Sequence, residues 1–237
     1  MGFEVDIRKT VRSAQRSFEL QVRFTTHARR TVIYGPSGAG KSLTLQAMAG
    51  LISPDSGRIA FGGDVLFDRA AGIDIPARHR GFGYLFQDYA LFPKLNVRQN
   101  IAFGLSHGLR NPSAHAGSEA VDRWLRAFEL VEVAAQRPGE LSGGQRQRTA
   151  LARALAHSPR ALLLDEPFSA LDPELRGRMR TELDELLRRV DIPVVMITHD
   201  PEDLEWFGDA ALYLREGVLA ERPAPAARTV TTRLKAL

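Results

Sequence analysis

Short apolar runs alternate with amphipathic segments along most of the chain. The strands that this pattern predicts are Val5–Ile7, Phe18–Phe24, Thr31–Tyr34, Arg58–Phe61, Gly83–Phe86, Ala161–Leu164, Val194–Thr198 and Ala211–Leu214. Ala161–Leu164 has no polar residue, which is typical of a strand buried on both faces of a parallel sheet. Since helical segments separate many of these runs, the pattern predicts an α/β fold with a largely parallel sheet.

Helical spacing dominates two longer stretches. From Val97 to Ala156 the chain reads as helices and loops, and one apolar stripe at i, i+3, i+4 and i+7 consists of Val121, Trp124, Leu125 and Phe128. Ser106–Ser118 is rich in Gly, Ser, Asn, Pro and Ala and is predicted to be a surface loop. A further helix is predicted from Pro173 to about Val190. The helical stretch therefore interrupts the α/β pattern.

A glycine-rich turn follows the strand predicted at Thr31–Tyr34 and leads into a helical segment. It reads Gly35, Pro36, Ser37, Gly38, Ala39, Gly40, Lys41 and Ser42, which fits G-x-x-x-x-G-K-[ST]. Glycine lets backbone N–H groups close around phosphate oxygens, and the helix N-terminus adds partial positive charge. The turn therefore predicts a nucleotide phosphate site, with Lys41 on the β- and γ-phosphates and the Ser42 hydroxyl on Mg²⁺.

Two adjacent carboxylates, Asp165 and Glu166, end the apolar run Ala161–Leu164. The carboxyl end of a strand is where open α/β sheets bind their ligands. We expect Asp165 to orient Mg²⁺ through the water that this ion retains. We expect Glu166 to polarise the water that attacks the γ-phosphate.

A second glycine-containing segment begins another predicted helix, Gly143–Ala156. It consists of Leu141, Ser142, Gly143, Gly144 and Gln145. Ser142 and Gln145 form a capping-box pattern, so the segment can be interpreted simply as a helix start. The two glycines are poor helix formers in a first turn. The helix stability that these glycines sacrifice is explained if a phosphate must approach the backbone closely at this helix end.

The glycine turn, the LSGGQ segment and the apolar run ending in Asp165 and Glu166 occur in an order that resembles the ATP-binding cassette (ABC) family. These are ATPase subunits that power membrane transporters. The resemblance implies a P-loop NTPase domain of the ABC type over residues 1–220, with a mixed or parallel sheet core and an antiparallel β subdomain. It also implies an inserted helical subdomain at approximately 88–158. Residues 221–237 are expected to be a short tail without a regulatory domain.

The resemblance further implies a head-to-tail dimer that encloses two ATP molecules, each contacted by residues Leu141 to Gln145 of the opposite subunit. Three other positions match the family. Gln87 resembles the glutamine that senses Mg²⁺ and the attacking water, and His199 resembles the histidine that contacts the γ-phosphate. The family's inter-subunit loop is matched by Ser169, Ala170, Leu171 and Asp172. Asp172 followed by proline is also an ordinary helix N-cap.

One position departs from the family pattern. Relatives usually stack adenine on an aromatic residue some two dozen positions before the glycine turn. Here that neighbourhood is Thr10-Val11-Arg12-Ser13, and the nearest aromatic residue, Phe18, falls late and in a strand pattern. We therefore consider Arg12 as a substitute that holds the base by a cation–π contact.

The stretches Gly83–Pro93 and Asn100–Leu105 resemble bacterial import ATPases of the molybdate, sulfate and sugar group. The apolar patch Tyr89–Phe92 suits a groove that receives a helix of an integral membrane permease. The missing adenine aromatic and the Arg78–Gly83 context favour molybdate. The implied partners are a second ATPase subunit, identical or not, the permease and, indirectly, an extracytoplasmic solute-binding protein. The implied location is the cytoplasmic face of the membrane.

Composition narrows the alternatives. The 237 residues include no cysteine, which excludes a disulfide framework and a thiolate metal site. The formal charge is +4, but the arginines are scattered without an aromatic-interleaved stripe, so we expect no nucleic acid partner. Two competing classes remain: a soluble ABC ATPase acting on nucleic acid or ribosomes, and a nucleotide-binding regulatory module without turnover. The second class predicts loss of Glu166 or His199, and both are present.

Overall fold

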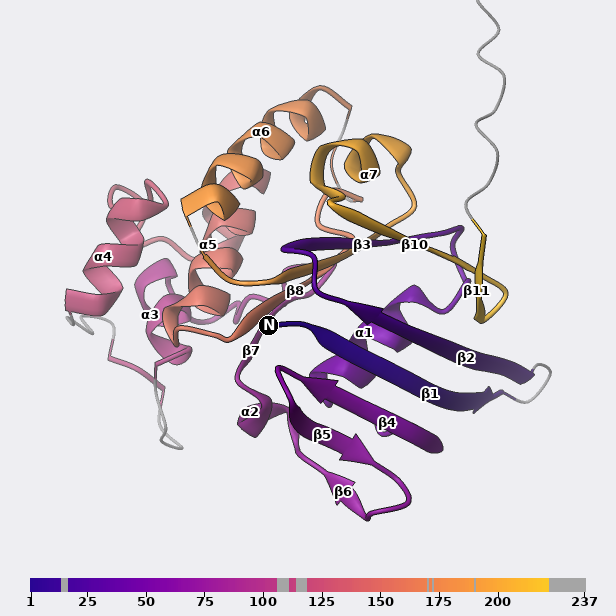
Figure 1. Ribbon diagram of the computed structural model, residues 1–237. Helices are drawn as coiled ribbons and strands as arrows, with labels where there is room; N and C mark the ends of the chain where they lie inside the picture. The colour runs from indigo at the N-terminus through magenta and orange to yellow at the C-terminus, as the bar shows by residue number, and fades with distance from the viewer. Residues whose placement is uncertain are drawn as a thin grey trace, which may run out of the picture.

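A mixed sheet forms the centre of the molecule in the computed structural model, which describes residues 1–13, 17–105, 111–113, 119–169, 171, 173–189 and 191–221. Eleven strands of this described part hydrogen-bond in the order β6-β5-β4-β1-β2-β11-β10-β3-β9-β8-β7. One half of the sheet is parallel and the other is mainly antiparallel (Figure 1). The α/β class and the mixed sheet are confirmed.

The parallel half carries the glycine turn and the two carboxylates. Its strands are β10 (Ala210–Arg215), β3 (Arg30–Tyr34), β9 (Val194–Thr198), β8 (Ala161–Asp165) and β7 (Phe82–Leu85), and each runs parallel to its neighbour in this order. Every residue of β8 and β9 is buried, as their apolar sequences predict. The carboxyl ends of β3, β8 and β9 therefore meet at one edge.

The antiparallel half is larger than the sequence pattern indicated. It consists of β1 (Phe3–Arg12), β2 (Ser17–Thr26), β4 (Ser56–Phe61), β5 (Asp64–Asp68) and β6 (Ile73–Asp74). Strands β1 and β2 pair over ten positions, because polar residues on their exposed face extend the ladder beyond the apolar runs. β11 (Val218–Ala220) is antiparallel to β10 and parallel to β2, and so joins the two halves.

Helices cover the sheet and form two groups. The helices are α1 (Lys41–Ala49), α2 (Ala77–Arg80), α3 (Val97–Phe103), α4 (Glu119–Ala127), α5 (Gly143–Ala156), α6 (Pro173–Arg189) and α7 (Pro201–Phe207), with a 3-10 turn at Pro138–Glu140. α3, α4 and α5 lie together on the side away from β4, β5 and β6 (Figure 1). One apolar core joins residues of α3 to α6 with the sheet, and a second joins α1 with the antiparallel strands.

Several expectations were incomplete or lie outside the described residues. The short elements β5, β6, β11, α2 and α7 were not predicted, because few of their residues form a periodic apolar pattern. α6 ends at Arg189, so the predicted helix end at Val190 is outside the described residues, as are most of the predicted loop 106–118 and nearly all of the tail 221–237. No helix among the described residues has the length and apolar character that crossing a bilayer requires.

Candidate functional site

The glycine turn connects β3 to α1 and leaves the start of that helix open. Gly40 is the N-cap of α1 with φ 100°, and Gly38 has φ 79°, both in the left-handed region that favours glycine. The N-cap residue Gly40 has no side chain with which to cap this helix N-terminus. Its backbone N–H groups and partial positive charge therefore face whatever enters the turn, which is the arrangement that binds phosphate.

Lys41 lies inside the turn and is only 4% exposed. Its Nζ donates to the carbonyl oxygens of Gly35 (2.8 Å) and Pro36 (3.0 Å) and lies 3.2 Å from Oε1 of Glu166. Two carbonyls and one carboxylate thus balance the buried ammonium group. An entering phosphate would meet an ammonium group that is already positioned by the backbone.

Asp165, the last residue of β8, is held through both carboxylate oxygens. Ser42 Oγ donates to Oδ1 (3.1 Å), and the Tyr84 hydroxyl donates to Oδ2 (2.9 Å). Burial raises the pKa of Asp165, and the two hydrogen bonds only partly oppose this effect. Burial beside Asp165 raises the pKa of Tyr84 well above its ordinary value, so its hydroxyl is a neutral donor at physiological pH.

The donor set at Asp165 fits Mg²⁺. This ion prefers a few protein oxygens together with phosphate and water oxygens over an all-protein cage. Ser42 and Asp165 supply hydroxyl and carboxylate oxygens next to the phosphate turn, whereas no group of three or more His, Asp or Glu within the described ranges is arranged around a metal. Sequence reasoning missed Tyr84, although a phenol in the apolar strand β7 was the available signal.

Glu166 and His199 meet because β8 and β9 are neighbouring strands. Glu166 follows β8 with φ 43°, a conformation that costs a non-glycine residue free energy, and its N–H donates to the Ile197 carbonyl of β9 (3.1 Å). Its Oε2 lies 3.0 Å from Nδ1 of His199, which directly follows β9. The structure therefore brings the predicted base and the predicted γ-phosphate contact into one hydrogen-bonded pair.

An open hollow of about 500 Å³ lies over the glycine turn. Its lining residues are Val11, Phe18, Ser37, Gly38, Gly40, Lys41, Ser42, Leu43, Gln87 and Glu166. The aromatic ring in it is that of Phe18, whose Cζ would lie 3.0 Å from a Cβ atom added to Gly40. Arg12 is exposed and is not among the residues that line the hollow, so the structure favours Phe18 over Arg12 as the side chain beside the base.

The β1–β2 register explains why Phe18 rather than Arg12 lines the hollow. Val11 of β1 pairs with Phe18 of β2, so both side chains arrive at the glycine turn together, although seven positions separate them in sequence. Arg12 pairs with Ser17 at the end of the ladder, one position out of phase with Val11. Because successive side chains in a strand point to opposite faces, this one-residue step places Arg12 away from the hollow.

The predicted second half-site does not line this hollow. In α5 the Ser142 Oγ accepts from the Gln145 N–H (3.2 Å), and Gln145 Oε1 accepts from the Ser142 N–H (2.8 Å), so the capping box is formed. Leu141 is buried, and Gly144 lies against Met179 of α6. The structure thus brings this segment against α6, and residues 141–145 are not among those that line the hollow.

The predicted inter-subunit loop is described in part. Ser169 donates from both Oγ (3.0 Å) and N–H (3.2 Å) to the Glu166 carbonyl, and Leu171 is buried. Ala170 and Asp172 lie outside the described residues. Arg176, on the first turn of α6, donates to the Leu171 carbonyl (3.0 Å) and to Asp200 (2.9 Å), and no motif in the sequence pointed to it.

Known proteins match both the sequence and the fold. The chain is 45% identical over 203 residues to the Fe(3+) ions import ATP-binding protein FbpC of Pseudomonas fluorescens Pf-5, which covers 83% of the chain and 54% of that protein. It is 38% identical over 210 residues to the molybdenum import ATP-binding protein ModC of Paramagnetospirillum magneticum AMB-1, which covers 89% and 57%. The chain thus spans about half the length of the curated relatives it matches.

A solved structure is similar along almost its full length. It is the dimeric post-hydrolysis state of the ATP-binding cassette MJ0796 bound to ADP and Pi, with a TM-score of 0.73 and 28% identity over 94% of this chain and 97% of that one. The profile of the ABC transporter family matches residues 21–169, which contain the glycine turn, the LSGGQ segment and both carboxylates. On this match and these relatives, the chain belongs to the ABC transporter family.

Proposed function

We propose that this protein is the ATP-hydrolysing subunit of an ABC importer. The observation that carries the proposal is the convergence of Lys41, the Ser42–Asp165 pair and the Glu166–His199 pair on the uncapped start of α1. These groups supply a phosphate anchor, oxygen ligands for Mg²⁺ and a general base in one place. The import ATP-binding names of the relatives add the transport role.

Each residue has a distinct part in the proposed reaction. Lys41 and the N–H groups of the turn hold the phosphates, and Phe18 and Val11 give the base an apolar surface. Ser42 and Asp165 would hold Mg²⁺, which supplies charge compensation when bound. Glu166 accepts a proton from the attacking water, His199 orients Glu166 and contacts the γ-phosphate, and Gln87 faces the same hollow.

The second half-site belongs to a partner in this proposal. Residues 141–145 begin α5 and do not line the hollow over the glycine turn of their own chain, so we expect them to act on nucleotide bound by another copy or by a paired subunit. Dimeric structures of a similar cassette support this arrangement. Ser169 hydrogen-bonds to the Glu166 carbonyl, and the predicted inter-subunit loop that it begins would face the partner as well.

The patch Tyr89–Phe92 supports docking of a permease at the cytoplasmic face of the membrane. Tyr89 and Ala90 have φ 64° and 42°, and Arg153 of α5 donates to their two carbonyl oxygens (2.8 and 2.7 Å). The Phe92 ring lies 4.3 Å from that of Phe103, which is 37% exposed. A rigid, partly exposed aromatic pair close to Gln87 suits an apolar permease helix.

For the cargo we propose an inorganic ion delivered by an extracytoplasmic binding protein. Molybdate is the prediction from the sequence context, and one relative is named for molybdenum import. Relatives named for Fe(3+) import make iron the main competitor, ahead of sulfate or a sugar. Uptake of radiolabelled molybdate and iron by cells with and without the encoding gene would decide between the two ions.

The Glu166→Gln variant tests the proposed ATPase. It should bind ATP and dimerise with it, because shape and hydrogen bonding are kept, while turnover falls by about 100-fold or more because the base is lost. Glu132→Gln changes an exposed glutamate in the helical region and should hydrolyse ATP like the wild type. Unchanged turnover in Glu166→Gln would contradict the assigned role. Binding of polynucleotide that weakens steeply with salt would favour the nucleic acid class instead.

A further inference from the structure

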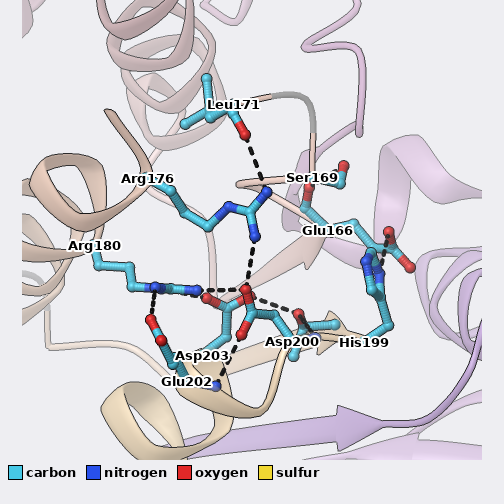
Figure 2. Close-up of polar contacts among 10 residues, drawn as sticks. Glu166, Ser169, Leu171, Arg176, Arg180, His199, Asp200, Glu202 and Asp203 are labelled. Carbon is cyan, nitrogen blue, oxygen red and sulfur yellow. Dashed lines mark hydrogen bonds and ion pairs between the residues drawn. The ribbon is translucent and has the colours of Figure 1, made fainter. Parts of the chain in front are cut away.

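A buried arginine joins the start of α7 to α6. Arg180 is 3% exposed, and its Nε donates to Asp203 Oδ1 (2.6 Å) while Nη2 donates to Asp200 Oδ2 (2.7 Å). Its Nη1 donates to Glu202 (Figure 2). Although burial alone would lower the pKa of Arg180, its hydrogen bonds and the three carboxylates raise it, so the guanidinium stays charged. Arg180 therefore anchors α7 to α6.

Arg176, one helical turn earlier, makes a different connection. Its Nη1 donates to Asp200 Oδ2 (2.9 Å), the same oxygen that Arg180 holds, while its Nη2 donates to the Leu171 carbonyl (3.0 Å). Figure 2 shows Arg176 between Leu171 above it and Asp200 below it. A guanidinium group can span two acceptors because its donors lie in a rigid planar fork. Arg176 thus joins the inter-subunit loop to the residue that follows His199.

Asp200 has little freedom to move by itself. Its Oδ1 accepts from the Glu202 N–H (2.9 Å) as the N-cap of α7, and its own N–H donates to Thr198 Oγ1 (3.0 Å). Partial burial raises the pKa of Asp200, but the hydrogen bonds from Glu202, Arg176 and Arg180 lower it by more. Asp200 is therefore tied to residues on both sides of His199 and moves together with it. The backbone of His199 lies between it and Thr198.

These contacts lie around one small cavity beside the predicted base. His199 Nδ1 lies 3.0 Å from Glu166, the Glu166 carbonyl accepts from Ser169, and Arg176 returns from Leu171 to Asp200. A cavity of about 10 Å³ lies among these side chains, which is about the room that one water molecule needs. Because so little free space remains in this cavity, a displacement of the loop at Ser169 should also displace the side chains on the opposite wall, those of Arg176 and Asp200.

We propose that Arg176 is a positioning residue that couples the inter-subunit loop to His199. When the partner subunit engages the loop, Leu171 moves with it, and the fork of Arg176 passes this displacement to Asp200 and so to the backbone of His199. The His199–Glu166 pair then takes its hydrolytic geometry only in the closed dimer. The inference rests on the proposed function, because it requires ATP hydrolysis by a dimer.

The first test replaces the guanidinium group of Arg176 in the 237-residue chain. Arg176→Gln should lower kcat by about tenfold to 100-fold, as expected for a displaced catalytic group, while the affinity of the monomer for ATP and the KM change less than about threefold. Arg178→Ala removes an exposed arginine from the same helix and serves as the matched control with wild-type kinetics. If the Arg176 contacts only supported folding, their loss would lower kcat only in proportion to the folded fraction, which thermal unfolding measures. Such proportional loss, or an unchanged kcat, would overturn the proposal.

Arg176→Lys keeps the charge and covers the case in which the glutamine variant does not fold. A lysine ammonium is a single point donor and cannot span Leu171 and Asp200 in the same way. The expected result is a Tm close to that of the wild type with kcat lowered at least about threefold. Full rescue of kcat by lysine would show that charge alone is needed, and this result would overturn the coupling.

A double-mutant cycle then tests whether Arg176 acts through Asp200. Asp200→Asn keeps a good N-cap for α7 while it weakens the ion pair. If the two residues act together, kcat of the double variant should lie within about twofold of the lower single variant, whereas multiplied losses would overturn the route. Failure of the wild type to hydrolyse ATP or dimerise would instead defeat the proposed function, and this inference with it. Normal wild-type turnover with an insensitive Arg176 would defeat this inference alone.

Discussion

Glycine-containing motifs lie at the starts of α1 and α5, and these two helix starts are built in opposite ways. At α1 the N-cap residue Gly40 has no side chain and a left-handed backbone, and Lys41 is held against carbonyls inside the turn. At α5 the Ser142–Gln145 capping box is complete, and the first turn lies against α6. Both starts carry partial positive charge, yet within the described part of the chain the lysine, the carboxylates and the hollow lie beside the first.

The start of α1 belongs to a site that is assembled within one chain, whereas in our proposal the start of α5 is a surface that completes the site of another chain. The groups around α1 all belong to one chain and are already paired, Lys41 with Glu166 and Ser42 with Asp165. The α5 start has its own cap and needs no ligand to be stable. Its function, in our proposal, depends on a second subunit. Variants at the two helix starts should therefore fail in different assays.

Lys41→Ala should have the largest effect at the α1 start. Loss of a charge-assisted contact to phosphate costs about 3 kcal/mol, which corresponds to roughly a 100-fold loss of ATP affinity. Equilibrium binding of a fluorescent ATP analogue to the monomer measures it. Lys94→Ala, which removes an exposed lysine, is the matched control. Near-normal binding by Lys41→Ala would mean that the phosphates lie elsewhere.

Ser142→Arg should act only in the dimer. The longer cationic side chain fills the surface that the partner's nucleotide approaches, so turnover should fall below about a tenth of the wild-type value. The affinity of the monomer for ATP should change less than about twofold. Loss of the cap costs about 1 kcal/mol of unfolding free energy. Ser142→Ala loses the same cap without filling the surface, so it should share the lower stability and keep more turnover. Equal turnover in both variants would argue against a shared site.

The two helix starts also show what sequence can and cannot predict. The glycine turn, the capping box and the strand preceding Asp165 were predictable, because each depends on residues that are close in sequence. The convergence of β3, β8 and β9 followed from the buried parallel strands. Strands β5, β6 and β11 were missed, because their formation depends on neighbours already in the sheet.

Side chains that contact residues of other helices or strands were harder to predict from the sequence. Tyr84 reaches Asp165 from the next strand, and Arg176 reaches both Leu171 and Asp200 from a helix. Their partners lie 81, 5 and 24 positions away, so no local pattern marks them. The preference for Phe18 over Arg12 was equally hard to predict, because the pairing register of β1 and β2 decides which side chain faces the hollow.

Phe18→Ala should have a moderate effect, again at the α1 side. Removing an aromatic contact to the base costs about 1 kcal/mol beyond lost area, so the KM for ATP should rise by roughly fivefold while kcat is kept. Arg12→Ala should change KM by less than about twofold, since Arg12 is exposed and outside the hollow. ATPase titrations of the two variants provide the comparison. The opposite order of effects would restore the cation–π interpretation.

Two glycine substitutions in α5 should have the smallest effects on stability, and they distinguish packing within the chain from contact with the partner's nucleotide. A Cβ at Gly144 would lie 3.2 Å from Met179 Sδ, whereas at Gly143 the nearest atoms, from Leu171 and Leu175, are 3.6 Å away, an ordinary contact. Gly143→Ala should therefore gain roughly 0.5 kcal/mol of unfolding free energy from helix propensity, and Gly144→Ala should gain about nothing, because crowding of the flexible Met179 offsets it. Denaturant unfolding measures both values. If Gly143→Ala is more stable yet hydrolyses ATP more slowly, without weaker binding by the monomer, then the missing Cβ at Gly143 serves the nucleotide of the opposite subunit rather than the packing of its own. Wild-type turnover in that variant would leave Gly143 an ordinary helix-start residue and remove the main reason to assign α5 to a shared site.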